Sequence, residues 1–201
     1  MQASFDTTKS PDRGFTLVEL LVVMLIAGVL LAGFTAFYLS QQRALRHHQI
    51  EVDLSQALRT ALEQMSRELR SARKDVTRDF VANTGGAQPT FLAWTATEVQ
   101  FELDANDDGD KTDAGEHRGF RLNGSSVEQY DDTTNTWVAL AGFANGLTLT
   151  YLACDGTTAT GADAIATVGI SLTMQQSQPV GGLPVSRTET EQVRLRNVRC
   201  S

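Results

Sequence analysis

An almost unbroken apolar run, FTLVELLVVMLIAGVLLAGFTAFY, occupies residues 15–38. A helix of this length spans roughly 36 Å at about 1.5 Å per residue, and the apolar core of a bilayer is about 30 Å thick. The pattern therefore predicts a membrane-spanning helix over residues 15–38. A secretory signal peptide fits poorly, because its apolar core is shorter, a basic region precedes it and a small-residue cleavage site follows it. An ordinary single-pass anchor remains an alternative.

Beyond this run the apolar residues recur at intervals of three or four through about residue 78. This spacing places them on one face of a helix. We therefore expect one near-continuous helix from about residue 16 to 78, with an amphipathic stem over 39–78. The residues of the apolar face are Leu54, Leu58, Leu62, Met65, Leu69, Ala72 and Val76.

The chain after residue 78 changes to a period of two, as expected for short strands that are buried on one face. Turn-forming residues end the helical part at 83–89 and separate strands at 131–135, and we expect a loop over 175–187. The pattern predicts an α+β fold in which the helix packs on an antiparallel β-sheet head over 79–201. The expected inward-facing residues are Val99, Phe101, Leu103, Phe120, Leu122, Leu147, Leu149, Tyr151, Val168, Ile170, Leu172, Met174, Val193 and Leu195.

Composition and charge exclude several classes of protein. The chain is 41% hydrophobic with a net charge of −7, which excludes a disordered chain and argues against nucleic acid as a partner. The stem over 40–78 holds eight basic and five acidic residues, whereas 79–201 holds seven basic and sixteen acidic ones. His47, His48 and His117 have no triad companions or zinc-ligand spacing in the sequence, and no hydrolase motif occurs, so we expect neither an enzyme nor a zinc site.

The residues around the start of the apolar run carry a specific motif. Arg13-Gly14-Phe15-Thr16-Leu17-Val18-Glu19-Leu20 follows a short polar leader. It resembles the processing site of type IV prepilins and type II secretion pseudopilins. The resemblance implies that residues 1–14 are a leader peptide, that a prepilin peptidase cuts between Gly14 and Phe15, and that the new terminal amine of Phe15 is N-methylated.

Glu19 is the one charged residue inside the apolar run, and a carboxylate in lipid usually has a partner. Cleavage would place an α-amine cation on Phe15 in the same apolar environment. A staggered neighbouring subunit can present its Glu19 to that amine with better geometry than the same helix can. Glu19 and Phe15 would then set the register of a helical assembly, which is the role that the family gives to this glutamate.

The resemblance implies a structural subunit of an envelope-spanning filament. The stem looks like that of PilW-like minor pilins and of J-type secretion pseudopilins, which prime or cap assembly of a type IV pilus or type II secretion pseudopilus. Its partners would be other pilins or pseudopilins, the prepilin peptidase and the inner-membrane assembly platform. The protein would span the inner membrane once, with an exported, periplasmic head. The alternative is a filament-tip adhesin or a ligand-binding subunit for DNA uptake.

Two cysteines, Cys154 and Cys200, lie in the expected head. An exported head reaches an oxidising compartment, so a disulfide between them is expected to hold the C-terminal strand against the strand that ends near Leu152. Two buried free thiols are the alternative, since the sequence does not supply the geometry of the pair.

An acidic segment between two expected strands is the other chemical feature. Its oxygen-bearing residues alternate as in the first half of an EF-hand calcium loop, but its last glutamate comes one residue late and no helices flank it. An acidic hairpin turn explains the same residues. Calcium is therefore a possible cofactor, and the candidate ligands are Asp104, Asn106, Asp108, Asp110, Thr112 and Glu116.

Overall fold

The computed structural model describes residues 14–72, 91–103, 105, 113–177, 184–196 and 198. One long helix, α1 (Leu17–Ser71), precedes all the strands. The chain divides into two compact units, Met1–Arg46 and His47–Ser201. The predicted helix is confirmed from Leu17 to Ser71, and its expected continuation over 73–78 lies outside the described residues.

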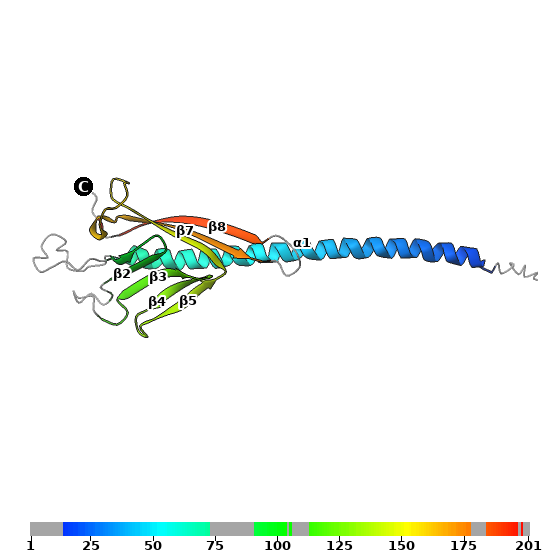
Figure 1. Cartoon of the computed structure of the whole chain (residues 1–201), viewed down its shortest axis with the longest axis horizontal. Coiled ribbons are helices and arrows are strands. Elements are labelled where there is room, and N and C mark those ends of the chain that lie inside the picture. The colour runs from blue at the N-terminus through cyan, green and yellow to red at the C-terminus, as the bar shows by residue number, and fades with distance from the viewer. Residues whose placement is uncertain are drawn as a thin grey trace, which may run out of the picture. The chain divides into compact units, whose positions relative to one another are not determined.

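The second unit holds two antiparallel sheets (Figure 1). The five-stranded sheet has the order β1-β2-β3-β4-β5 and the three-stranded sheet has the order β6-β7-β8, so each is a simple meander. The predicted α+β layout is confirmed, with two sheets in the head. The bounds are β1 (Phe91–Trp94), β2 (Glu98–Glu102), β3 (His117–Asn123), β4 (Ser126–Asp131), β5 (Thr136–Gly142), β6 (Ala144–Leu152), the 3₁₀ turn η1 (Ala162–Ala164), β7 (Thr167–Gln176) and β8 (Val185–Arg194).

A single hydrophobic core joins the stem to both sheets. Within this unit, Figure 1 shows β7 and β8 on one side of the stem part of α1 and β3 to β5 on the other. The helix can pack against both sheets because its apolar residues recur every three or four positions, and each strand contributes alternate residues to the core. The most buried members include Leu58, Met65, Leu69, Phe91, Phe101, Phe120, Ile170, Leu172 and Met174.

The predicted strands are confirmed where apolar residues alternate with polar ones, so that one face of the strand is apolar. Val99 and Phe101 are buried in β2, and the four predicted residues of β7 are all buried. The sequence analysis did not identify β1, β4 or β5. β5 is an edge strand with mostly exposed or half-buried residues, so it lacks a clear inward-facing period.

The prediction of a loop over 175–187 was wrong at both ends. Gln175 and Gln176 belong to β7, and β8 begins at Val185. The pairing of β7 with β8 supplies the reason, because it continues to the pair Gln176 and Val185. The backbone ladder extends these strands although their ends carry polar side chains.

Alternate residues of β8 form salt bridges with the stem of α1. Arg187 pairs with Glu51, the Glu189 Oε1 atom lies 3.9 Å from Arg59 Nε, and Arg70 Nη2 donates to Glu191 Oε1 over 3.2 Å. All of these side chains are partly exposed, so each pair contributes little to stability. Together they align β8 with the helix.

Candidate processing and assembly site

The start of α1 is built by a capping residue. Thr16 precedes the first helical residue, and its Oγ1 accepts a hydrogen bond of 3.3 Å from the backbone N–H of Glu19. The carbonyl of Thr16 accepts from the N–H of Leu20 over 3.2 Å. A threonine followed three residues later by a glutamate is the pattern of a helix N-terminus. Glu19 therefore lies in the first turn, where a negative charge also suits the helix dipole.

Gly14 has no structural reason to be glycine. A Cβ built on Gly14 meets nothing within 4 Å, and the same holds for Gly28 and Gly33 inside the helix. Alanine at position 14 would therefore meet no steric obstacle among the described residues. Contacts within the described residues therefore place no requirement for glycine at this position.

The first part of α1 is apolar and exposed among the residues that the structure describes. Its most apolar 18-residue window has a mean hydropathy of 2.7 and is 0% buried. Phe15 is 80% exposed, and the side chain of Glu19 has no ion pair among the residues that the structure describes. So large an exposed apolar surface is typical of a segment that lipid or another protein covers, and its length is enough to cross a membrane. Phe15 precedes α1 and Glu19 lies in its first turn, so both are at the N-terminal end of that surface.

The acidic segment is held at one end by Glu116, the one predicted calcium ligand that the structure describes. Its carboxylate is 1% exposed and accepts the N–H of Ala105 at 2.8 Å and that of Asp113 at 3.1 Å. Asp132 Oδ2 in turn accepts from the N–H groups of Gly115 and Glu116. The predicted ligands Asp104, Asn106, Asp108, Asp110 and Thr112 lie outside the described residues.

Glu116 thus has a structural role that the sequence analysis missed, and calcium binding stays a prediction. We expect Glu116→Gln to lower the free energy of unfolding by about 1–3 kcal/mol without calcium, because the amide places an N–H against a buried N–H. Thermal melting of the full chain measures this loss. If the segment also binds calcium, millimolar calcium should raise the melting temperature of the wild type but not of Asp108→Asn. Equal melting of Glu116→Gln and wild type would contradict the structural role.

Cys154 follows the end of β6 and is disulfide-bonded. Cys200 lies outside the described residues. The pairing of Cys154 with Cys200 accordingly stays a prediction.

A cavity of about 390 Å³ lies beside the last turn of α1. At its wall Arg118 Nε is 3.8 Å from Glu68 Oε2, and Gln129, which is not a lining residue, donates to Glu68 Oε1 over 2.8 Å. Burial raises the pKa of Glu68, although Arg118 opposes the shift. The charged carboxylate is therefore disfavoured on folding, and this group's contribution to stability improves as pH falls through its raised pKa. The lining residues are Arg67, Glu68, Arg70, Ser71, Leu103, Arg118 and Arg196.

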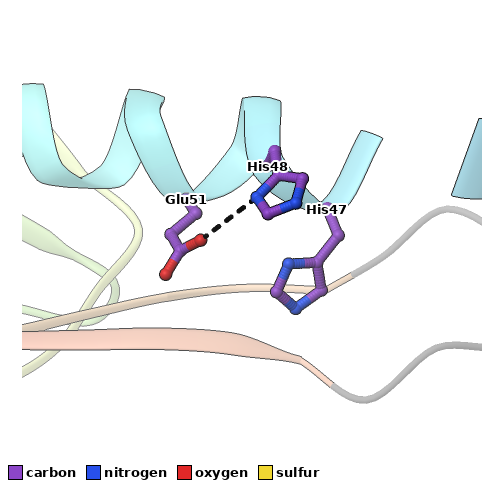
Figure 2. A group of neighbouring side chains, drawn as sticks. All are labelled: His47, His48 and Glu51. Carbon is purple, nitrogen blue, oxygen red and sulfur yellow. Dashed lines mark ion pairs between the residues drawn. The ribbon is translucent and has the colours of Figure 1, made fainter. Parts of the chain in front are cut away.

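The three histidines lie in two different environments. His117 Nε2 lies 3.0 Å from Gln100 Oε1, and its ring packs 4.3 Å from that of Tyr130, measured between centroids. His47 and His48 gather with Glu51 on the stem (Figure 2). The sequence analysis did not identify this group, because helical metal motifs commonly have a second histidine four residues after the first. Here the residue four positions after His47 is the carboxylate Glu51.

Comparison with known families identifies a motif in the N-terminal segment. Residues 9–35 match the model of the prokaryotic N-terminal methylation motif, the signature of type IV prepilin-like proteins. No curated protein and no solved structure matches the chain significantly. The match covers Gly14, Phe15 and Glu19 together with most of the exposed apolar helix, so the predicted resemblance is confirmed for this part of the chain.

Proposed function

We propose that this type IV pilin- or pseudopilin-like protein is a minor subunit that primes or caps assembly of a type IV pilus or a type II secretion pseudopilus. The chain carries the N-terminal methylation motif at residues 9–35, and type IV prepilin-like proteins are structural subunits rather than enzymes. One observation supports the assembly role most directly. Among the described residues, the most apolar window of α1 is 0% buried, and the helix carries a carboxylate in its first turn.

In this proposal the apolar part of α1 occupies two environments in turn. Before assembly, lipid covers the helix and the protein is anchored by a single pass, with its head exported to the periplasm. After the prepilin peptidase has removed the leader, the inner-membrane assembly platform brings the helix into contact with those of other pilins or pseudopilins. Both environments are apolar, so the transfer requires no exposure of the helix to water. The head has its own core and does not depend on this exchange.

Copy number distinguishes a minor subunit from a major one. We expect quantitative mass spectrometry of sheared filaments to find far fewer copies of this chain than of the principal subunit. Deletion of its gene should reduce the number of filaments, since priming is lost, and the full chain supplied in trans should restore them. Copy number equal to that of the principal subunit would contradict the minor role. Normal filament numbers with lost adhesion or DNA uptake would favour the ligand-binding alternative.

A further inference from the structure

The stem carries a cluster of metal-ligating side chains outside the processing site. The ligand atoms of His47, His48 and Glu51 all lie within 4.8 Å of one another. His48 Nδ1 is 3.7 Å from Glu51 Oε2, and the two imidazole rings are nearly perpendicular, with centroids 6.1 Å apart. Figure 2 shows the three side chains projecting to the same side of α1. Residues three and four positions apart on a helix are surface neighbours, which explains how both histidines reach Glu51.

The position of Glu51 is fixed from a second element. Arg187 of β8 donates a hydrogen bond to Glu51 Oε1. The other oxygen, Oε2, is left on the side of His48. A partner that holds a ligating carboxylate in orientation is what metal sites commonly use outside their ligands. Arg187 therefore acts as a positioning residue in this cluster.

The donor set identifies the class of ion. Bonds from zinc to nitrogen are about 2.0–2.1 Å, so donors around one ion lie roughly 3.3–4.2 Å apart, and small rotations of these exposed side chains bring the three atoms to that spacing. Imidazole nitrogen suits zinc, copper and nickel, whereas calcium and magnesium require oxygen ligands. With Arg187 beside Glu51 the local charge is close to neutral, so affinity depends on the imidazoles rather than on accumulated negative charge.

We propose that His47, His48 and Glu51 bind one divalent transition-metal ion such as zinc. Each contributes one ligand, and water completes the coordination because both histidines are exposed. The site joins α1 to β8 through Arg187 and Glu51, so the bound ion stabilises the contact between the stem and the three-stranded sheet. This site is independent of the processing and assembly residues, and its failure would leave the proposed function untouched.

Zinc titration of the full chain tests the proposal. The protein is purified in detergent without a polyhistidine tag, stripped with a chelator, and titrated with zinc by calorimetry. We expect one ion per chain, with affinity weakened about tenfold or more in His47→Ala and in His48→Ala. The matched control is His117→Ala, which removes a histidine that contacts Gln100 and Tyr130 and should retain the wild-type affinity.

Copper supplies a second readout that counts the ligands. Electron paramagnetic resonance of the copper-loaded chain should show hyperfine coupling to two imidazole nitrogens in the wild type and to one in either single variant. Circular dichroism establishes that the variants keep the helix and the sheets. The proposal is overturned if zinc does not bind, if both single variants bind as the wild type does, or if His117→Ala abolishes binding.

Discussion

Gly14→Ala is expected to leave the leader, residues 1–14, attached to most of the protein. A Cβ at position 14 meets no atom within 4 Å, so the substitution does not disturb the chain itself. The peptidase must bring the bond between Gly14 and Phe15 to its catalytic groups, and a misplacement of about 1 Å in an active site can cost about 100-fold in rate. Intact-mass measurement of the membrane-extracted protein, produced together with a prepilin peptidase, distinguishes the two forms.

Two other glycines provide matched controls for this experiment. Gly28→Ala and Gly33→Ala add the same methyl group at positions inside α1, which begins three residues after Gly14, and again a Cβ there meets nothing within 4 Å. Both variants should lose residues 1–14 as the wild type does and begin at a Phe15 that carries one added methyl group. A Gly14→Ala protein that matures at the wild-type rate would refute the assignment of the cleavage site. Retention of the leader by the wild type would refute processing altogether.

The sequence predicted the parts of the fold in which one physical signal dominates. A long apolar run identifies the first part of α1, and a period of three to four identifies the stem, whose Leu58, Met65 and Leu69 are buried. β7 has a clear period of two. β5 does not, because an edge strand exposes most of its residues, and its pairing with β4 comes from backbone groups that leave no pattern in the side chains.

The candidate sites also differ in how far they could be predicted from the sequence. Gly14, Phe15 and Glu19 could be found because their motif is local in the sequence, and the methylation-motif match covers all three. The role of Glu116 could not be predicted. Its partners are backbone N–H groups of Ala105 and Asp113, and any residue type supplies such a group. Likewise, the contact of Glu51 with Arg187 joins residues far apart in the chain, and only the folded structure brings them together.

Glu19→Gln is expected to abolish most incorporation into filaments while leaving membrane insertion intact. The amide has nearly the shape of the carboxylate and removes its charge from the apolar segment. In the proposed assembly the Phe15 amine of a neighbouring subunit then loses its counter-ion. Removal of one partner from a buried ion pair costs about 3–5 kcal/mol, or a factor of about 100 or more in an equilibrium. The ratio of filament-bound to membrane-bound protein, measured by quantitative immunoblotting, gives this factor.

Two comparisons separate the charge of Glu19 from its place in the first turn of α1. Thr16→Ala removes the hydroxyl that accepts from the Glu19 N–H and should cost only about 1 kcal/mol, so incorporation should fall much less. Glu63→Gln removes an exposed carboxylate from the stem of the same helix and should have no effect. Equal losses in Thr16→Ala and Glu19→Gln would assign the effect to the helix start. If Glu19→Gln were incorporated as well as the wild type, no buried amine could depend on this carboxylate. An amine that had lost its counter-ion in so apolar a surface would prevent assembly.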